Sequence, residues 1–228
     1  MVPRPSSFLV AGAAVAFVIV LAVLVSAGMT DAFDRPIIEF IRRPDLSNAL
    51  RVLGPLTDLG GTWGVTVVAA LIVAVGAAIG PWRHGVIGGL TVLAASIANG
   101  AAKVAIARTR PDLLEPIIVE HGFSFPSGHS ALGMVAYGVL AVLVSRSRLP
   151  FIARRGIVIG LAVLIFLIGL SRIWLGVHYP TDVLAGWAAG AAVVLLYARL
   201  TRSVSREPAE GAVDEDPAAP RSDQPVPG

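Results

Sequence analysis

Six long apolar segments constrain the fold of this chain more than any other feature of its sequence. Each is close to the ~20 residues that a helix needs to cross the hydrocarbon core of a bilayer. The sequence therefore predicts an all-α integral membrane protein with six transmembrane helices in a compact bundle. The predicted spans are residues 8–28, 59–80, 84–107, 128–145, 151–171 and 181–200.

The composition agrees with a membrane protein and excludes several other classes. Apolar residues make up 55% of the 228 residues and charged residues only 14%, whereas a soluble domain carries roughly 25% charged residues. The chain has no cysteine, which excludes a disulfide framework, a thiolate metal site and a cysteine nucleophile. The net charge is only +3 and the basic residues are dispersed, so the sequence offers no basic face for a nucleic acid.

The apolar segments belong to one predicted membrane domain, residues 1–202, and a polar tail follows it. The tail, residues 203–228, is rich in Pro, Ala, Asp and Glu without an apolar period, so we expect it to be disordered. The first segment has a second interpretation, because Arg4, an apolar run and the small residues at 25–27 resemble a secretory signal. The run is longer than such signals usually have, so we expect an uncleaved first span.

The loop between the first two spans, residues 29–56, contains a short amphipathic pattern. Four apolar residues recur there at helical spacing, with charged residues between them: Phe33, Ile37, Ile38 and Ile41. This pattern fits a helix that lies in the membrane interface. It fits equally well a helix that caps the end of the bundle.

The arginines predict how the bundle is oriented in the membrane. With six spans, both termini and the loops near 81–83 and 146–155 lie on one side, and that side carries more of the arginines outside the spans. The positive-inside rule then places that side in the cytoplasm. We therefore expect a protein of the plasma (inner) membrane, with cytoplasmic termini and with the loops after the first, third and fifth spans on the extracytoplasmic side.

The first of three polar clusters on that outer side is at the end of the third span. Lys103 and Arg110 are seven residues apart, close to two helical turns, so they fall on nearly one face. Pro111 then ends or redirects the helix. A lysine at membrane depth is either functional or extends its ammonium group to the interface, and the spacing alone leaves both interpretations open.

The second cluster, Ser127, Gly128 and His129, directly precedes the fourth span. Ser and Gly at a helix start leave free backbone N–H groups, which together with the helix dipole form an anion site. His129 stands beside that site. The alternative is an ordinary capping turn with an incidental histidine.

The third cluster lies between the last two spans and contains Arg172, His178 and Asp182. If a helix begins near Pro180, which favours a first turn, His178 and Asp182 are one turn apart. A carboxylate in that position holds one imidazole nitrogen protonated and leaves the other free to attack. A structural histidine–carboxylate pair is the alternative.

Together the clusters bring three cations, a helix N-terminus, two histidines and one aspartate to one membrane face. Such a set suits a phosphate group, which carries about −1.5 to −2 charge and whose transfer depends on positioning and charge stabilisation. One histidine would attack phosphorus, and the other would protonate the leaving oxygen. No cluster of carboxylates that would hold a metal is evident, so we expect neither a metal nor another cofactor.

These residues resemble the type-2 phosphatidic acid phosphatase superfamily over about residues 50–200. The matching motifs are K-x6-R-P from Lys103 to Pro111, P-S-G-H from Pro126 to His129, and S-R-x5-H-x3-D from Ser171 to Asp182. Most members of this family are metal-independent phosphatases of lipid phosphates or diphosphates. The superfamily also includes soluble vanadium haloperoxidases, but the apolar spans argue against that branch.

The resemblance implies a role for each matching residue. His178 would be the nucleophile that forms a phosphohistidine, Asp182 would orient it, and His129 would be the general acid. The phosphate oxygens would be bound by Lys103, Arg110, Ser127, Gly128 and Arg172.

We therefore expect a metal-independent phosphatase with its active site at the outer membrane face. Its substrate would be a membrane lipid phosphate or diphosphate such as undecaprenyl diphosphate, phosphatidylglycerophosphate or phosphatidic acid, with its tail in the bilayer. Two alternatives remain open: a phosphotransferase of the same fold with a lipid or sugar acceptor, and a lipid-binding or transport protein without chemistry. The sequence does not determine the oligomeric state.

Overall fold

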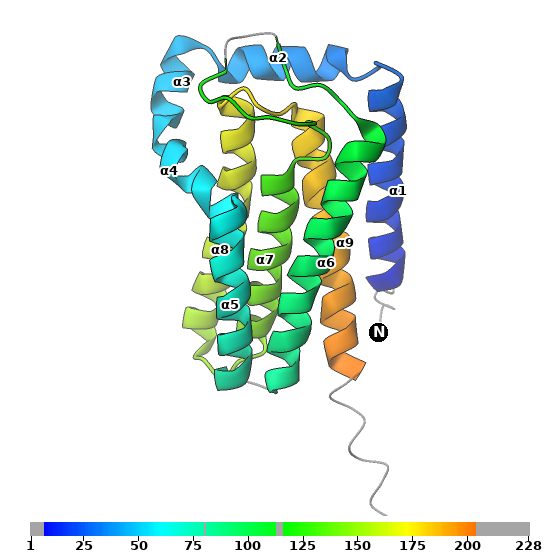
Figure 1. The fold of residues 1–228 in the computed structure, drawn as a ribbon. Coiled ribbons are helices and arrows are strands. Elements are labelled where there is room, and N and C mark those ends of the chain that lie inside the picture. Colours follow the sequence, from blue (N-terminus) through cyan, green and yellow to red (C-terminus); the bar gives the residue numbers. More distant parts are fainter. Residues whose placement is uncertain (1–6, 80, 113–115, 204–228) are drawn as a thin grey trace, which may run out of the picture.

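The computed structural model describes residues 7–79, 81–112 and 116–203, and the regular elements within these ranges are all helices (Figure 1). The all-α prediction is therefore confirmed for the described residues. The elements are α1 Ser7–Ser26, α2 Asp31–Ile41, α3 Pro44–Ala49, η1 Leu50–Leu53, α4 Gly54–Thr57, η2 Asp58–Gly60, α5 Thr62–Ile79, α6 Trp82–Ile106, α7 Gly128–Ser145, α8 Phe151–Trp174 and α9 Pro180–Ser203.

Within the described ranges, five helices are each long and apolar enough to cross a membrane: α1, α6, α7, α8 and α9. The remaining predicted span, near 59–80, corresponds to α5, and Leu50–Gly60 and Thr62–Ala78 meet there at a bend of 58°. Gly61 lies at the bend with an extended backbone (φ −74°, ψ 174°), which ends one helix and allows the next to begin. Within the described ranges there are thus five candidate spans, or six if the bent pair counts as one, and the five lie close to predicted segments.

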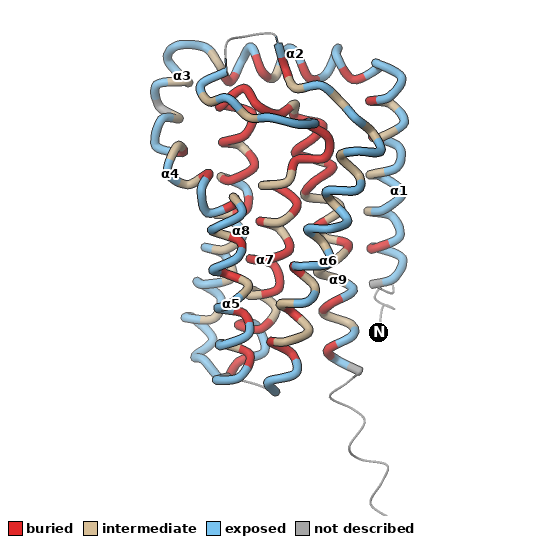
Figure 2. Tube along the Cα trace, viewed as in Figure 1, coloured by how far each residue is buried: buried red, intermediate tan, exposed pale blue. Residues whose placement is uncertain are grey.

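α7 lies at the centre of the bundle, in contact with α5, α6, α8 and α9 (Figure 1). It is buried along most of its length, whereas α1 and α5 are largely exposed on their outer sides (Figure 2). Val135 and Val139 of α7 share a core with Ile72 of α5, Ile168 of α8 and Tyr197 of α9. Because lipid tails are as apolar as these side chains, the association of the helices depends on close packing.

Two glycines of α9 allow this helix to approach α7 closely. A Cβ atom added at Gly186 would lie 2.8 Å from the carbonyl oxygen of Ser127, and one at Gly190 would lie 2.7 Å from Cβ of Met134. Neither distance leaves room for a larger side chain. The two glycines therefore bring the N-terminal parts of α7 and α9 together, and with them His129 and Asp182.

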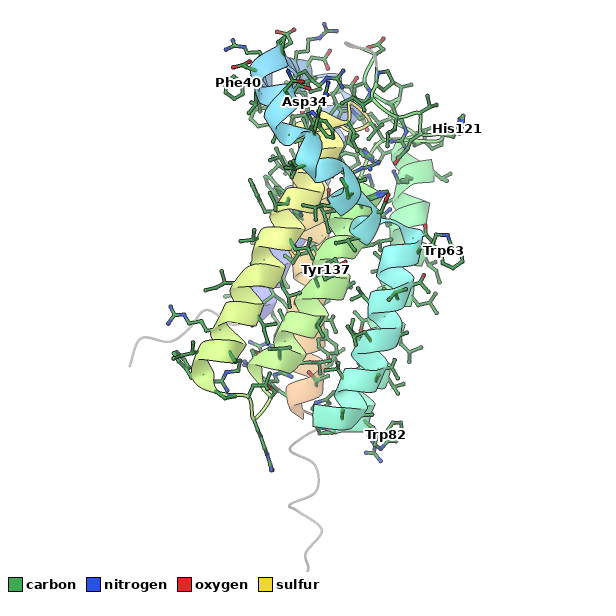
Figure 3. All side chains as sticks on the ribbon, turned by 90° about the vertical axis from the view of Figure 1, so that its left-hand side faces the viewer. Asp34, Phe40, Trp63, Trp82, His121 and Tyr137 are labelled. Atoms are coloured by element: carbon green, nitrogen blue, oxygen red, sulfur yellow. The ribbon has the colours of Figure 1, made fainter. Side chains whose placement is uncertain are left out.

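Large apolar side chains are exposed on the outer faces of the long helices, as expected where helices meet lipid. Trp63, near the start of α5, is 84% exposed, and Trp82, at the start of α6, is 61% exposed. Figure 3 shows both rings projecting outward, at different heights of the bundle. Tryptophans in such places are typical of the two membrane–water interfaces.

α2 lies across the end of the bundle (Figure 1). Its inner face buries Ile38 and Ile41, which pack against the segment around Trp174 and Val177. Phe40 points away from the bundle (Figure 3) and is 54% exposed. The helix predicted within residues 29–56 is therefore present, and it caps the bundle.

The beginning of α1 and the end of α9 lie at the same end of the bundle, opposite to α2 (Figure 1). α1 packs along α9, and its Leu21 and Val25 are buried in a cluster with Phe125 and Ala185. Residues 204–228, nearly all of the predicted tail, lie outside the described residues.

Candidate active site

The three polar clusters meet at the end of the bundle that α2 covers. The segments 124–127 and 171–178 are buried there (Figure 2). Ala107 ends α6 in a left-handed conformation (φ 50°), and the chain then runs across the bundle end. Gly176, with φ +78°, provides the sharp turn between α8 and α9, a conformation that costs glycine little.

Ser127 connects the second and third clusters. Its side chain caps α7 by accepting hydrogen bonds from the Ser130 backbone N–H (3.5 Å) and the Ser130 hydroxyl (3.0 Å). Its own backbone N–H donates to the carbonyl oxygen of Asp182 at 3.0 Å. The start of α7, with Gly128 and its free N–H groups, is thereby attached to the first turn of α9.

His178 and Asp182 form a buried pair across the start of α9, as their spacing predicted. Nδ1 of His178 lies 3.4 Å from Oδ2 of Asp182, and the two side chains are 1% and 0% exposed. Nε2 of His178 lies 3.4 Å from a terminal nitrogen of Arg110. The ring therefore has a carboxylate on one side and a cation on the other, where an anion would bind.

The protonation of His178 suits a nucleophile. Burial lowers the pKa of His178 to about 4, although Asp182 acts in the opposite direction. The imidazole is therefore neutral near pH 7 and keeps a free electron pair on one nitrogen. With Nδ1 facing Asp182, that electron pair belongs to Nε2.

Arg110 and Arg172 lie next to each other and share the carboxylate of Glu120. Arg110 forms an ion pair with Oε2 of Glu120 at 3.1 Å, and Arg172 pairs with Oε1. Arg172 is fully buried, and its other terminal nitrogen donates to the hydroxyl of Thr57 at 2.6 Å. Burial by itself would raise the pKa of Glu120, but Arg172 and Arg110 hold it below its usual range.

Sequence reasoning missed Glu120 and Thr57. Neither belongs to a motif, and a single glutamate in a loop or a threonine in a short helix has no spacing that marks it. Thr57 contacts Arg172 across 115 positions of sequence, and Glu120 contacts it across 52. Only the fold shows that Glu120 binds the two guanidinium groups that a phosphate would need.

Lys103 is in the last turn of α6 and points toward the same end of the bundle. Its ammonium group donates to the carbonyl oxygens of Phe123 (2.7 Å) and Ser124 (3.4 Å). A Cβ atom added at Gly128 would lie 3.8 Å from Cε of Lys103. Lys103 therefore supports the loop before α7, and its side chain lies close to Gly128.

His129 is in the first turn of α7, against the bend between η2 and α5. A Cβ atom added at Gly61 would lie 3.4 Å from Nε2 of His129, so the absence of a side chain there leaves room for the ring. Arg172, Glu120 and Lys103 lie close enough for their charges to act on His129. The structure thus gathers the predicted site residues, from α6, α7, α8, α9 and the loops between them, at one end of the bundle.

His121, in the loop that carries Glu120, has its side chain at the outer edge (Figure 3). Its backbone carbonyl, rather than its ring, contacts the site, by accepting a hydrogen bond from Arg110 at 3.1 Å. Within the described ranges, no three histidine or carboxylate side chains are grouped so that they could hold a metal ion.

An apolar cavity of about 310 Å³ lies between α1, α6, α7 and α9. Asn99 and Pro126 line it near the polar end, and Val18 of α1, Ala98 of α6 and Val193 of α9 line it further on. Asn99 also lies 3.4 Å from a Cβ atom added at Gly128, so one molecule could place a charged group in the site and an apolar chain in the cavity.

Comparisons with known proteins identify a family and several relatives. The sequence matches the model of the PAP2 superfamily over residues 85–206. It is 32% identical over 198 residues to phosphatidylglycerophosphatase B of Bacillus subtilis (strain 168), covering 83% of this chain and 94% of that protein. It is 30% identical over 114 residues to an undecaprenyl-diphosphatase of Sulfolobus acidocaldarius, covering 47% of this chain and 50% of that protein.

Among solved structures, the fold is similar to that of a transmembrane PAP2-type phosphatidylglycerolphosphate phosphatase from Bacillus subtilis. The TM-score is 0.75 at 29% sequence identity, and the superposition covers 86% of this chain and 98% of that one.

Proposed function

The chain belongs to the PAP2 superfamily, and from this membership we propose that it is a membrane phosphatase that hydrolyses a lipid phosphate or diphosphate without a metal ion. The observation that carries the proposal is the placement of His178, with Nδ1 3.4 Å from Asp182 and Nε2 3.4 Å from Arg110. A neutral imidazole held in this way directs its free electron pair toward the group that the cations bind.

The proposed reaction is a double displacement. The phosphate oxygens bind Arg110, Arg172 and Lys103, together with Ser127 and the Gly128 N–H. Nε2 of His178 forms a bond to phosphorus while the bond from phosphorus to the leaving oxygen breaks, and His129 gives its proton to that oxygen. Water, deprotonated by His129, then attacks the phosphohistidine and releases inorganic phosphate. Asp182 stabilises the imidazolium that forms in the first step.

The apolar cavity supports a lipid as the substrate. It is lined by Ala102 and Pro126, which precede Lys103 and Ser127 in the chain, and its volume of about 310 Å³ is enough for part of an acyl or prenyl chain. The relatives named above act on phosphatidylglycerophosphate and undecaprenyl diphosphate, so these two lipids, with phosphatidic acid, are the substrates that we propose to test first.

The distribution of arginines supports a site on the extracytoplasmic face of the plasma membrane. The turns α5–α6 and α7–α8 lie at the end of the bundle opposite to the site (Figure 1), and the arginines there include Arg83, Arg146 and Arg148. By the positive-inside rule that end is cytoplasmic. The proposed topology has six spans within residues 1–202, with both termini and the tail in the cytoplasm.

Phosphate release by the purified full-length protein in detergent tests the reaction. Each lipid and a soluble phosphate ester are offered with EDTA, and His178→Ala is compared with wild type and with His121→Ala, whose ring lies outside the site. We expect release that resists EDTA, is lost in His178→Ala and is kept in His121→Ala. Release that persists in His178→Ala would contradict the proposal, and transfer of phosphate to an added alcohol in place of water would favour the phosphotransferase.

A further inference from the structure

The two oxygens of the Asp182 carboxylate have different partners. Oδ2 faces Nδ1 of His178 and accepts a hydrogen bond from the Tyr179 backbone N–H at 2.9 Å. Oδ1 accepts from a terminal nitrogen of Arg108 at 2.7 Å. The family motifs named above do not include Arg108, yet it binds the carboxylate that orients the proposed nucleophile.

Arg108 is itself held from several sides. The nitrogen that binds Asp182 also donates to the hydroxyl of Thr181 at 2.8 Å. The other terminal nitrogen donates to Oδ2 of Asp34 at 2.8 Å and to the hydroxyl of Thr30 at 2.9 Å. The guanidinium carbon lies 3.8 Å from the centre of the Tyr179 ring. A planar group with two donating nitrogens meets all these partners at once, which an ammonium group does not.

Asp34 connects this arginine to the capping helix α2. Its side chain is fully buried and points from α2 into the bundle (Figure 3). Oδ1 accepts from the backbone N–H of Thr181 at 2.9 Å, and Oδ2 accepts from the Thr181 hydroxyl at 2.7 Å. Asp34 therefore binds both Arg108 and the first turn of α9, which carries Asp182.

We propose that Arg108, held by Asp34, is a positioning residue that fixes the Asp182 carboxylate so that its Oδ2 keeps Nδ1 of His178 protonated and Nε2 directed at phosphorus. Arg108 lies behind Asp182, on the side away from His178, and does not take part in binding the phosphate. Without the charge of Arg108, the carboxylates of Asp34 and Asp182 would repel each other. Asp182 would then turn away from His178 or take up a proton. The inference rests on the proposed role of His178 as nucleophile.

The proposal predicts a loss of turnover without a loss of phosphate binding. Arg108→Gln should lower kcat about 10- to 100-fold, by analogy with the loss when a hydrogen-bonded partner that orients a metal-ligating histidine is removed. KM and the inhibition constant of inorganic phosphate should stay near their wild-type values. Arg108→Lys, which restores a cation between the two carboxylates but not the planar fork, should recover part of kcat.

A double-mutant cycle tests the role of Asp34. Asp34→Asn should lower kcat as Arg108→Gln does, and the double variant should be no worse than either single variant, because the two side chains act as one unit. Arg35→Gln, an exposed arginine on the same helix, is the matched control and should leave kcat unchanged. Size-exclusion profiles and melting temperatures in detergent show which variants are folded.

The outcomes separate this inference from the proposed function. If His178→Ala is inactive while Arg108→Gln and Arg108→Lys both keep wild-type kcat, the positioning role is wrong and the phosphatase stands. The positioning role would also be wrong if Arg108→Lys had a lower kcat and a proportionally higher inhibition constant for inorganic phosphate. Arg108 would then act on anion binding or on the fold. If Arg108→Gln does not fold, Arg108→Lys alone decides. Activity in His178→Ala would overturn the proposed function and the inference with it.

Discussion

The protonation of His178 depends on burial, and this has a consequence for stability that does not require a substrate. In the folded protein the pKa of His178 is about 4, whereas the ordinary value for histidine is 6.5. Between these two values the unfolded chain binds a proton that the folded protein does not, so stability falls as the pH decreases from 6.5 toward 4.

We therefore expect the melting temperature of the wild-type protein to fall further between pH 7.5 and pH 5 than that of His178→Gln. The variant lacks the titrating ring, so that part of the acid destabilisation disappears. Thermal unfolding in detergent measures both, with His121→Gln as the matched control for an exposed histidine. An equal loss of melting temperature in wild type and His178→Gln would contradict a depressed pKa.

Glu120 competes with the proposed substrate for Arg110 and Arg172. In this structure its two oxygens bind the two guanidinium groups, and a phosphate needs the same donors. Glu120→Gln replaces the carboxylate with a neutral amide that binds them more weakly. We expect KM and the inhibition constant of inorganic phosphate to fall roughly threefold to tenfold, equal to about 0.7–1.4 kcal/mol.

The matched control for Glu120 is Asp112→Asn, an exposed carboxylate in the segment that follows α6. It removes one negative charge near the site without releasing an arginine. If both variants lowered KM equally, general charge rather than competition for the arginines would explain the effect. A rise of KM in Glu120→Gln would mean that the carboxylate prepares the arginines for the phosphate.

At the level of the helices, α1 has two faces with different tasks. Val18 lines the apolar cavity beside α6 and α9, while Val20, two positions along, is 55% exposed on the outside. The inner face of α1 thus forms part of the wall along which the lipid chain would lie.

Filling the cavity should discriminate between substrates. Val18→Trp should raise KM for a long-chain lipid phosphate but leave the hydrolysis of a soluble phosphate ester unchanged, because only the chain needs the cavity. Val20→Trp adds the same bulk toward lipid and should affect neither substrate. Steady-state kinetics in mixed micelles gives the comparison, and an equal effect on both substrates of Val18→Trp would place the lipid chain elsewhere.

On the scale of the whole molecule, the orientation in the membrane can be tested directly because the chain has no cysteine. Val119 is 77% exposed in the loop at the site end, and Leu149 is 40% exposed in the α7–α8 turn at the other end. In intact cells a membrane-impermeant maleimide should label Val119→Cys. It should label Leu149→Cys only after the membrane is permeabilised, and the reverse pattern would place the site in the cytoplasm.

Much of this architecture could be predicted from local sequence features. The apolar segments are long enough to require helices, and their ends are marked by residues such as Pro180, so the predicted spans lie close to the helices. The pair His178 and Asp182 was predictable because four residues make one helical turn. The motif residues Lys103, Arg110 and Arg172 were recognisable because charge is costly near membrane depth and therefore rarely incidental.

Other features depend on contacts between residues far apart in the chain, and no local pattern encodes them. Asp34 meets Arg108 across 74 positions, and Glu120 meets Arg172 across 52. In the sequence Asp34 and Arg108 are ordinary loop charges, and they become a unit only because α2 folds over the end of the bundle. Helix periodicity and apolar length are properties of neighbouring residues, whereas the partner of a buried charge is decided by which helices pack together.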